Sequence, residues 1–473
     1  MTFCAVNPAT GEPGTQHDAL DAAGREQLLA RVHREQQQWR HEAPLTRERF
    51  TAALGAALTT HRETLAAALA REMGKPISAA RAEVDKCVQL CAEAPTMSRD
   101  ALASVPLAFD VTPNGTARTE VRYHALGTVL AIMPWNFPYW QALRFAVPAL
   151  LAGNGVLIKP AGIVPESGRL LQQCLSDANA ELAAHTLPPA PCHVAWLAVE
   201  AIDDIIADRR IAGVTLTGSD RAGRHVAAVA GRHLKKVVLE LGGSDPFLVL
   251  PDADVAAAAA TAATARTVNA GQSCIAAKRF IVCESVFDQF LTHFTAAMRA
   301  LRVGDPFSTD TQVGPLATAA GRDALHAQVI ASVRAGARLM LGGAPQPGLG
   351  NFYPPTVLVE VPDHAPAARE ELFGPVAAVF RVSDSEEAIT VANRSPFGLG
   401  ASVWTQNVLD AERCIAALDV GMITVNDMVV SDARFPFGGV KDSGMGRELG
   451  PHGFREFTNP QTVRWVHRPA APR

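Results

Sequence analysis

The chain has 473 residues, of which 48% are hydrophobic, and its 43 basic and 47 acidic residues give a formal net charge of −4. A chain of this length can bury a large core, and at ~150 residues per domain it predicts two or three domains. Because the charges are spread along the chain, no basic face is available for a nucleic acid, and we expect none as a partner.

The sequence also lacks the features of an exported, membrane-bound or metal-binding protein. Its longest apolar stretch, residues 147–158, is too short and too interrupted to span a bilayer, so we expect no membrane association. The first residues, MTFCAVNPATGEPG, contain neither a secretory signal nor an Arg-rich transit peptide. Eight cysteines are scattered without a CxxC pair, and no histidine cluster has the spacing of zinc ligands. We therefore expect free thiols, no bound metal and a cytoplasmic location.

Apolar residues between positions 46 and 73 recur at steps of three and four, and Gly74 and Pro76 follow them. This spacing predicts one amphipathic helix over 46–73 that ends at Gly74. Short β-rich runs then alternate with helical stretches, which is typical of βαβ units on a parallel sheet. The predicted strands span residues 129–133, 155–160, 213–218, 236–241 and 246–250.

A second set of strands follows an Ala-rich helix that begins in the segment 251–265. These strands are predicted at residues 279–283, 337–343, 356–361 and 375–382. The two sets indicate two α/β lobes that divide near residue 242.

Two segments of the first lobe could contact a cofactor. Gly218 and Ser219 follow a predicted strand and precede a helix, where backbone N–H groups and a hydroxyl can hold a phosphate. The alternative is an ordinary helix N-cap, since the GxGxxG fingerprint is absent. Lys159 closes another strand before Pro160, at the sheet edge where ligands bind, and the alternative is a solvated lysine.

Cys274, in the segment NAGQSC, follows a small, glycine-containing turn that lets a ligand approach the backbone. If a helix starts after Cys274, its dipole lowers the thiol pKa and favours a reactive cysteine. The alternative is a buried structural cysteine.

Two further residues suit carbonyl chemistry. Glu240 lies in an apolar strand, where burial would raise its pKa and suit a general base. Its alternative is a strand-end glutamate that reaches solvent or forms an ion pair with Lys235 or Lys236. Asn136 lies between prolines that fix its backbone, so its amide can stabilise an oxyanion, and the alternative is a plain turn residue.

Seven motifs occur in a fixed order along the chain, namely MPWNFP, IKPAG, TGS, LELGGSDPF, NAGQSC, EELFGPV and FPFGGVKDSGMGRE. In this order and spacing the chain resembles the aldehyde dehydrogenase superfamily, from residue 7 to residue 463. Within that superfamily, EMGKP (72–76), AGNGVLIKPA and ELGGSDPF are similar to the bacterial succinate-semialdehyde dehydrogenase branch.

The resemblance implies a role for each matching residue. Cys274 is the nucleophile, the Asn136 amide and the Cys274 N–H hold the oxyanion, and Glu240 activates the water that hydrolyses a thioester. NAD is the implied cofactor, with NADP also accepted. The implied cofactor-binding residues are Trp135, Lys159, Gly218, Ser219, Glu371 and Phe373.

The resemblance also implies an α/β fold of the aldehyde dehydrogenase type. A Rossmann-like NAD(P)-binding domain would comprise residues 1–111 and 131–241, and an α/β catalytic domain residues 242–440. A small β oligomerisation arm would comprise residues 112–130 and 455–473. Since the strand edges of such an arm are satisfied only across an interface, we expect a homodimer or homotetramer.

Two positions depart from the pattern of many relatives. Gly162 replaces an acidic residue that binds the ribose hydroxyls of NAD, so exclusion of NADP by that carboxylate is lost. Ala276 replaces a second cysteine found near the nucleophile in some relatives, so no local disulfide switch is expected.

Arg144 lies on a mostly apolar helical segment, residues 139–153, where a buried cation needs an anionic partner. That partner is either an internal acid or a substrate, and a surface arginine is a further alternative. The resemblance matches Arg144 to an arginine that binds the substrate carboxylate in succinate-semialdehyde dehydrogenases, and places Ser431 and Arg434 in a loop of the same pocket.

Succinate semialdehyde, oxidised to succinate, is therefore the expected substrate. Another aliphatic aldehyde or an amino-aldehyde, a CoA-acylating reaction and a catalytically silent structural or binding protein remain alternatives.

Overall fold

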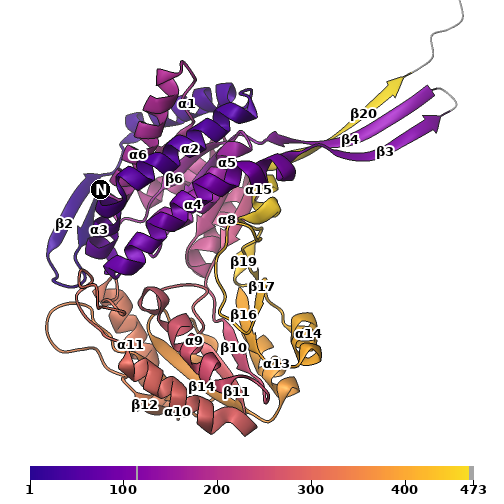
Figure 1. Cartoon of the computed structure of the whole chain (residues 1–473). Coiled ribbons are helices and arrows are strands. Elements are labelled where there is room, and N and C mark those ends of the chain that lie inside the picture. Colours follow the sequence, from indigo (N-terminus) through magenta and orange to yellow (C-terminus); the bar gives the residue numbers. More distant parts are fainter. Residues whose placement is uncertain (113–114, 468–473) are drawn as a thin grey trace, which may run out of the picture.

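A computed structural model describes residues 1–112 and 115–467 of the chain. Two large β-sheets, each flanked by helices, form the body of the molecule, and a narrow three-stranded sheet extends away from it (Figure 1). A short N-terminal hairpin, β1 (Thr2–Val6) and β2 (Pro13–Asp18), lies against the first part of the body.

The first sheet has the strand order β19-β9-β8-β5-β6-β7, and all its neighbours pair in parallel except β19. Its strands are β5 (Thr128–Ile132), β6 (Gly155–Lys159), β7 (Cys192–Val194), β8 (Ile211–Thr217), β9 (Lys236–Glu240) and β19 (Gly444–Met445). The order reverses between β5 and β8. In an open α/β sheet such a reversal creates a crevice at the carboxyl ends of the strands.

The register of the first sheet brings several predicted site segments to one edge. Ile132 pairs with Lys159 and with Leu216, and Thr217 pairs with Glu240. The strands therefore end at the same level, and the loops that follow them start side by side.

Alternate residues of these strands face two helical layers, as the period of a strand requires. Val129 and Ala131 pack with α2 to α6, whereas Leu130 packs with α1, α7 and α8. These helices are α1 (Ala22–Trp39), α2 (Pro44–Thr60), α3 (Arg62–Met73), α4 (Ile77–Leu102), α5 (Pro138–Leu151), α6 (Pro165–Ala184), α7 (Ile202–Ala207) and α8 (Asp220–Arg232), with a 3₁₀ turn η1 (Val199–Ala201).

The single helix predicted over residues 46–73 is wrong, because α2 and α3 are separate helices. They meet at His61, where φ is −94° and ψ is 8°, just after two β-branched residues of low helix propensity, Thr59 and Thr60. His61 Nε2 lies 2.8 Å from Asp177 Oδ2 of α6, which fixes the break. The predicted stop is confirmed, since Gly74 ends α3 in the left-handed region.

The second sheet has the order β12-β13-β14-β11-β10-β16-β17 and is parallel except for β12. Its strands are β10 (Pro246–Val249), β11 (Arg279–Cys283), β12 (Arg338–Leu341), β13 (Thr356–Val359), β14 (Val376–Val382), β16 (Gly400–Trp404) and β17 (Met422–Val425). Its helices are α9 (Val255–Thr267), α10 (Glu284–Ala300), α11 (Ala319–Arg334), α12 (Pro366–Arg369), α13 (Ser385–Asn393) and α14 (Val408–Ala417), with a 3₁₀ turn η2 (Val268–Gly271). β15 (Phe397–Gly398) and β18 (Val440–Lys441) form a separate antiparallel pair.

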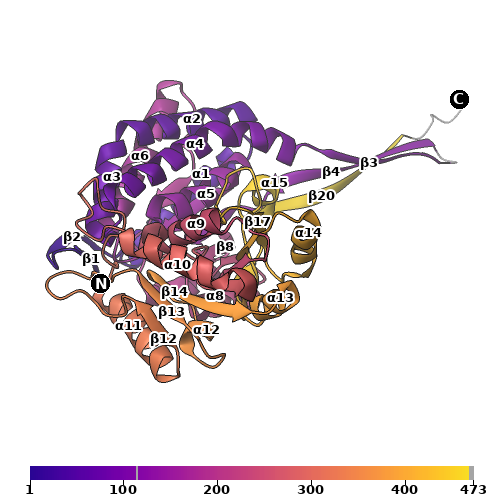
Figure 2. The same ribbon diagram turned by 60° about the horizontal axis from the view of Figure 1, so that its bottom comes forward.

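The projecting sheet is antiparallel, with the order β20-β4-β3. Its strands are β3 (Val105–Thr112), β4 (Gly115–Ala125) and β20 (Thr458–His467), and α15 (Gly450–Glu456) precedes the last of them. Figure 2 shows the three strands extending from the body in a second view. Residues 113–114 and 468–473 of the predicted arm lie outside the described residues, and the predicted domain boundaries stay a prediction.

All nine strands predicted for the two lobes are present, with ends shifted by one or two residues, as β5, β6 and β8 to β14. The Ala-rich helix is also confirmed as α9. In residues 1–112 and 115–467, no helix is both long enough and apolar enough to cross a membrane.

Candidate active site

Two cavities meet at the side chain of Cys274. The first, of about 280 Å³, lies between α4, α5 and residues of the loop 428–437, and we call it the α4–α5 cavity. The second, of about 230 Å³, lies at the carboxyl ends of β5, β8 and β9, and we call it the sheet-edge cavity. Six of the other seven cysteines are buried, whereas Cys274 is partly exposed. Two different molecules can therefore approach this thiol, one from each cavity.

The turn before Cys274 has a left-handed backbone at three successive residues. Asn269, Ala270 and Gly271 have φ values of 54°, 56° and 78°. Residues other than glycine adopt this conformation only where the surrounding structure enforces it, often at functional sites. A Cβ at Gly271 would lie 2.3 Å from the carbonyl group of Gly374, so only glycine fits there. The predicted glycine-containing turn is confirmed.

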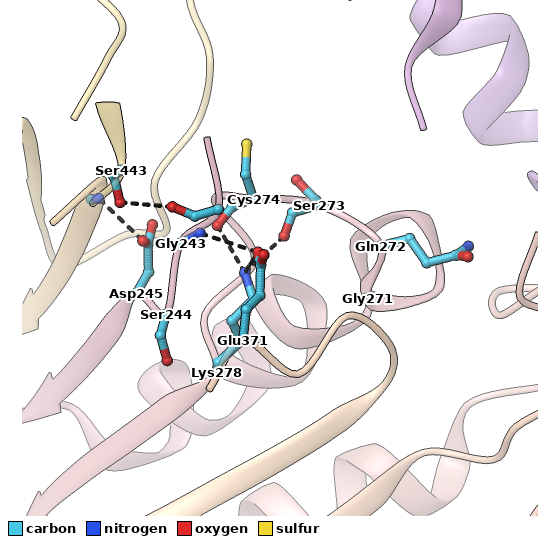
Figure 3. Close-up of polar contacts among 12 residues, drawn as sticks. Gly243, Ser244, Asp245, Gly271, Gln272, Ser273, Cys274, Lys278, Glu371 and Ser443 are labelled. Atoms are coloured by element: carbon cyan, nitrogen blue, oxygen red, sulfur yellow. Dashed lines mark hydrogen bonds and ion pairs between the residues drawn. The ribbon is translucent and has the colours of Figure 1, made fainter. Parts of the chain in front are cut away.

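Lys278 holds the backbone on the other side of the thiol. Its ammonium donates to the carbonyl oxygens of Ser273, at 2.9 Å, and Cys274, at 2.8 Å, and it lies 3.3 Å from Glu371 Oε1. Figure 3 shows the Cys274 sulfur pointing away from these contacts. Lys278 was not predicted as a site residue, since nothing in its sequence neighbourhood distinguishes it from an exposed lysine.

Two glycines after Glu240 allow the first lobe to approach this loop closely. A Cβ at Gly243 would lie 2.6 Å from the Cys274 carbonyl oxygen, and one at Gly242 would lie 2.6 Å from Glu371 Oε2. The Gly243 N–H also donates to Glu371 Oε1 at 3.1 Å. The LGGS motif therefore joins β9 to the cysteine loop through contacts that a side chain would block.

Asn136 lies in the wall of the sheet-edge cavity and is 5% exposed. Its Nδ2 donates to the carbonyl oxygen of Gln272 at 3.0 Å. The backbone carbonyl oxygen of Asn136 accepts hydrogen bonds from Asn269 Nδ2, at 2.9 Å, and from Lys75 Nζ, at 3.0 Å. A side-chain amide carries two N–H groups, so one can still donate to a molecule in the cavity.

A buried ion pair between Lys75 and Glu83 supports this segment. Glu83 Oε1 accepts hydrogen bonds from the backbone N–H groups of Tyr139 and Trp140, at 3.0 and 3.1 Å, and caps the N-terminus of α5. The Lys75 ammonium contacts Glu83 and the Asn136 carbonyl at the same time. Neither residue was predicted, although helical spacing places Glu83 on the buried face of α4.

The surroundings of Cys274 keep its thiol protonated. Burial raises the pKa of the thiol to about 12, and the cations Arg144 and Lys278 offset only part of this. The helix that would lower the pKa does not form, because a turn over residues 274–276 leads directly into β11. The aromatic and β-branched sequence RFIVC favours a strand there. At neutral pH the thiol must therefore lose its proton as it reacts.

Glu240 ends β9 with its carboxyl group buried and 1% of the residue exposed. Neither of its oxygens has a hydrogen-bond partner within the described residues. Burial raises its pKa well above the usual range, with the Arg144 cation opposing the shift and the Glu448 carboxylate adding to it. Glu240 is not among the residues that line either cavity.

The predicted alternative partners of Glu240 are engaged elsewhere. Lys235 Nζ donates to two backbone carbonyl oxygens, and Lys236 Nζ lies 3.3 Å from Glu456 Oε1. The alternative of an ion pair with these lysines is therefore wrong. A buried acid with a raised pKa is what a general base near neutral pH requires.

Five of the six predicted cofactor residues line the sheet-edge cavity, namely Trp135, Gly218, Ser219, Glu371 and Phe373. The rings of Trp135 and Phe373 pack edge to face with centroids 5.7 Å apart. Ser219 also has the ordinary role of an N-cap, because its hydroxyl accepts from the Ala222 N–H at 3.3 Å. Both interpretations of the TGS segment are thus compatible.

The sheet-edge cavity has the features that a dinucleotide needs. The N-terminus of α8 opens into it and can stabilise a phosphate. The buried Thr217 hydroxyl and Asn136 Oδ1 lack hydrogen-bond partners within the described residues, so both can bind a ligand. Gly242 keeps free the space beside Glu371 that a side chain would fill.

Lys159 is the sixth predicted cofactor residue and lies outside the lining of this cavity. It ends β6, is 8% exposed, and donates to the Pro160 carbonyl at 3.2 Å. Burial lowers its pKa. The alternative of a solvated lysine is therefore wrong.

Gly162 packs against the N-terminal hairpin. A Cβ at this position would lie 2.8 Å from Cδ1 of Phe3, a residue of β1 that is 6% exposed. A carboxylate of the kind found in NAD-preferring relatives therefore has no room at position 162 unless Phe3 moves.

Arg144 is 1% exposed and has two sets of neighbours. Its Nε donates to the buried Glu448 carboxylate, and its guanidinium carbon lies 4.2 Å from the centroid of the Phe437 ring. Arg144 also lines the α4–α5 cavity, and its Nη2 has no hydrogen-bond partner within residues 1–112 and 115–467. The internal salt bridge exists, yet one guanidinium nitrogen remains for a ligand.

The loop after β17 contributes one of its two predicted residues to the same cavity. Ser431 lines it, and its hydroxyl accepts a hydrogen bond from Trp140 Nε1 at 3.1 Å. Arg434 does not line it and instead makes a two-point contact with Asp432, at 2.9 and 2.6 Å. The side chain of Arg434 is 65% exposed, so the loop lines the pocket with Ser431 and not with Arg434.

The arrangement combines a thiol, an amide donor and a buried carboxyl group around one loop, with separate spaces for two molecules. A thiol can form a covalent adduct with a carbonyl carbon, and an amide can stabilise the resulting oxyanion. A buried acid can then activate water to release the product. The fold and the site thus define an enzyme that uses covalent thiol catalysis beside a dinucleotide-type cavity.

Comparison with known proteins identifies the family. The aldehyde dehydrogenase family model matches residues 1–463. The succinate-semialdehyde dehydrogenase (NADP+) of Mycobacterium avium (strain 104) is 43% identical over 467 residues, covering 98% of this chain and 97% of that protein. A protein of the same function name in Mycobacterium tuberculosis (strain ATCC 25618 / H37Rv) is 44% identical over 471 residues, covering 98% and 100%.

Solved structures agree with this assignment. A succinic semialdehyde dehydrogenase from Streptococcus pyogenes, in complex with NADP+, matches with a TM-score of 0.93 at 32% identity, covering 98% of this chain and 100% of that chain. The chain belongs to the aldehyde dehydrogenase family. It has the aldehyde dehydrogenase fold and is an aldehyde dehydrogenase, as the seven ordered motifs predicted.

Proposed function

We propose that the chain oxidises succinate semialdehyde to succinate through a thioester on Cys274. The observation that carries this proposal is Arg144, which lines the cavity that also contains Cys274 and whose Nη2 has no hydrogen-bond partner within the described residues. A guanidinium donor in a buried site suits a carboxylate. An aldehyde with a carboxylate at its other end would thus be held with its carbonyl group toward the thiol. The names of the mycobacterial relatives support the same substrate.

The reaction begins when the Cys274 thiol releases its proton to solvent, its sulfur bonds to the aldehyde carbon and the carbonyl π electrons move to the oxygen. Asn136 Nδ2 and the Cys274 backbone N–H donate to that oxygen. A nicotinamide cofactor bound in the sheet-edge cavity would supply the hydride acceptor for this oxidation, and loss of the hydride from the adduct would leave a thioester on the sulfur. The net reaction converts aldehyde, water and oxidised cofactor into acid, reduced cofactor and a proton.

Glu240 acts in the second half of the reaction. Its ionised carboxylate takes a proton from the water that attacks the thioester carbon, and the carbon–sulfur bond then breaks. Because Glu240 lines neither cavity, its side chain has to rotate toward Cys274 to reach this water.

The residues of the sheet-edge cavity would hold the nicotinamide dinucleotide. We propose that Ser219 and the α8 N-terminus bind its pyrophosphate, with Glu371 and Phe373 at the nicotinamide end and Lys159 near the adenine ribose. NADP+ is the proposed cofactor beside the NAD expected from the sequence. The names of the relatives support it, and no carboxylate at Gly162 repels a 2′-phosphate.

The projecting β20-β4-β3 sheet is proposed to pair subunits in a homodimer or homotetramer. Its outer strands present unpaired edges that a second copy can cover. The eight free cysteines support the predicted reducing, cytoplasmic environment.

A panel of aldehydes tested with each cofactor examines the proposal. We expect the highest kcat/KM for succinate semialdehyde, with free succinate rather than an acyl-CoA as product when CoA is added. Cys274→Ala should abolish the absorbance rise of the reduced cofactor and retain cofactor binding in a fluorescence titration, because it removes the nucleophile and little volume. A higher kcat/KM for uncharged butanal would refute the substrate, and turnover by Cys274→Ala would refute the mechanism.

A further inference from the structure

The lining of the α4–α5 cavity includes a further cation, Lys86, which has no role in the reaction steps above. Lys86 extends from α4 into the cavity, and its Nζ lies 4.1 Å from the centroid of the Trp140 ring. Trp140 in turn donates to Ser431 at 3.1 Å. The lysine therefore belongs to the same wall as the residues already assigned to the substrate side.

The acidic groups around Lys86 are taken by other cations. Glu83, on the same helix, is bound by Lys75 and by the N-terminus of α5. Asp432, on the loop after β17, is bound by Arg434 through both of its oxygens. Within the described residues, no carboxylate lies within salt-bridge distance of Lys86 Nζ.

The other charged or titratable groups that act on Lys86 are Arg144 on α5 and the buried Cys87 thiol on α4. The pKa of Lys86 is lowered to about 8, mainly by burial and next by the Arg144 cation. Cys87, Glu83 and Asp432 act in the opposite direction. Two like charges that share a partly buried cavity disfavour each other. An anion placed between them would relieve this repulsion.

Arg144 also has a guanidinium nitrogen, Nη2, without a hydrogen-bond partner in the described residues. The remaining lining of the cavity is mostly apolar and small, and includes Ala79, Ala82, Ala265, Val268 and Ile275. A mostly apolar cavity with a few convergent polar groups is typical of a small-molecule site. The charged groups of the lining are Lys75 and Glu83, which pair with each other, and the two cations Arg144 and Lys86. A ligand that contacts these two cations is complementary to them when it carries a negative charge.

We propose that Lys86 is a second cationic contact for the substrate carboxylate, and that it determines the preference for aldehydes with a carboxylate at the far end. This inference rests on the proposed function, since it concerns the same substrate. Arg144 is held in place by Glu448, whereas the Lys86 ammonium lies over the Trp140 ring and has no carboxylate partner in the described part of the chain. The Lys86 side chain can therefore move toward the substrate carboxylate. The point at which the two cations converge then determines which length of aldehyde binds.

Replacement of Lys86 separates this role from a structural one. Lys86→Met keeps the length and apolar stem of the side chain and removes the charge, so we expect the KM for succinate semialdehyde to rise about tenfold, the scale of one charge-assisted contact. The kcat for that aldehyde and the KM for butanal should move much less. Lys86→Arg should restore most of the lost affinity. Arg81→Met is the matched control, because it removes one cation from the same helix outside the cavity, where Arg81 pairs with Glu63.

Equal rises of the KM for charged and uncharged aldehydes in Lys86→Met would overturn the inference, and so would an unchanged KM for succinate semialdehyde.

The pH dependence gives a second readout that a merely structural lysine would not produce. Protonated Lys86 binds the carboxylate, so the ratio of kcat/KM for succinate semialdehyde to that for butanal should fall as pH rises through about 8. The ratio cancels the ionisation of Cys274 and Glu240, which act on both aldehydes. In Lys86→Arg the ratio should stay flat over this interval, because a guanidinium keeps its proton. A flat ratio in the wild type, or the same fall in Lys86→Arg, would contradict the inference.

Failure of this inference can be distinguished from failure of the proposed function. If wild-type enzyme prefers succinate semialdehyde and Lys86→Met keeps that preference, only the inference fails. If wild-type enzyme prefers butanal, the proposed function fails, and Lys86 is then tested by inhibition. Succinate should inhibit butanal oxidation more weakly in Lys86→Met than in wild type, while the neutral diamide of succinate should inhibit both alike, and equal succinate inhibition of both enzymes would overturn the inference.

Discussion

Glu240 carries a carboxyl group in surroundings that disfavour its charged form. Both of its oxygens lack hydrogen-bond partners within the described residues, and the nearby Arg144 cation is already bound to Glu448. Its pKa is therefore raised well above the usual range, mainly by burial. Such an acid holds its proton in weakly acidic solution and loses it only as pH rises. Its ionised form is then strongly basic, because desolvation makes a carboxylate a better proton acceptor.

Glu240→Gln should separate the two halves of the reaction. Acylation of Cys274 and hydride loss need no carboxylate, so a rapid burst of reduced cofactor is expected, followed by a steady state about 10²- to 10⁴-fold slower than in wild type. Stopped-flow absorbance measures both phases. In wild type the steady-state rate should rise with pH as Glu240 loses its proton, and this rise should be absent in Glu240→Gln. Equal slowing of burst and steady state would show that Glu240 is not the base for hydrolysis.

At the residue scale, the sequence predicted the groups that face the reactants better than those that support them. Cys274, Asn136 and five of the six cofactor residues were predicted, and all line a cavity. The supporting ions Lys75, Glu83 and Lys278 were not. Glu83 also binds the Tyr139 N–H, 56 positions away, and Lys278 also contacts Glu371, 93 positions away, and no local pattern encodes these long-range contacts. Arg144 is buried and Arg434 is exposed, and this difference in burial also depends on long-range packing.

The N-terminal hairpin is an element that influences the cofactor site from outside it. Phe3 of β1 lies against Gly162, and a Cβ there would be 2.8 Å from the Phe3 ring. The hairpin thus occupies the space in which an acidic side chain would project. Because Phe3 and position 162 share this contact, we expect a substitution at one of them to change which side chain fits at the other.

Gly162→Asp tests this coupling. Overpacking against Phe3 should cost about 1–3 kcal/mol and lower the apparent Tm by roughly 2–6 °C. In the double variant with Phe3→Ala the carboxylate has room, so the fall in Tm should be smaller than the sum of the two single effects. The same double variant should show a raised KM for NADP+ and little change for NAD+. Differential scanning fluorimetry and cofactor titrations measure both effects, and additive Tm changes would show that Phe3 does not restrict position 162.

At the element scale, strands were predicted where β-branched runs are bounded by turn residues, and all nine were found. The inner strand β16 was not predicted, since its first residues, Gly400, Ala401 and Ser402, have low strand propensity. Its place between β10 and β17 is enforced by tertiary contacts, including the Gly400 N–H donating to Asp245 at 3.1 Å. The break at His61 was missed for the same reason, because its fixing partner Asp177 lies on another helix.

At the scale of the whole molecule, the β20-β4-β3 sheet projects from the body with apolar side chains exposed. It extends away from both lobes in two views (Figures 1 and 2). Leu107, Trp465 and Val466 on it are 58%, 47% and 47% exposed. Exposed apolar side chains on a sheet with open edges mark a surface for another chain. A second copy of this chain is the occupant proposed above, because a symmetric assembly covers the same sheet in every subunit.

Trp465→Asp should weaken that assembly without changing the chemistry of a subunit. A buried aspartate at an apolar interface costs several kcal/mol unless it is paired, and the cost is paid in each copy. The assembled species should therefore dissociate at protein concentrations at which wild type stays associated. Sedimentation velocity over a dilution series measures this shift. Leu234→Asp is the control, since Leu234 is an apolar residue 95% exposed in the turn after α8 and belongs to none of the three strands of the projecting sheet. If Trp465→Asp assembles like wild type, or if Leu234→Asp dissociates equally, the projecting sheet is not the surface that joins the subunits.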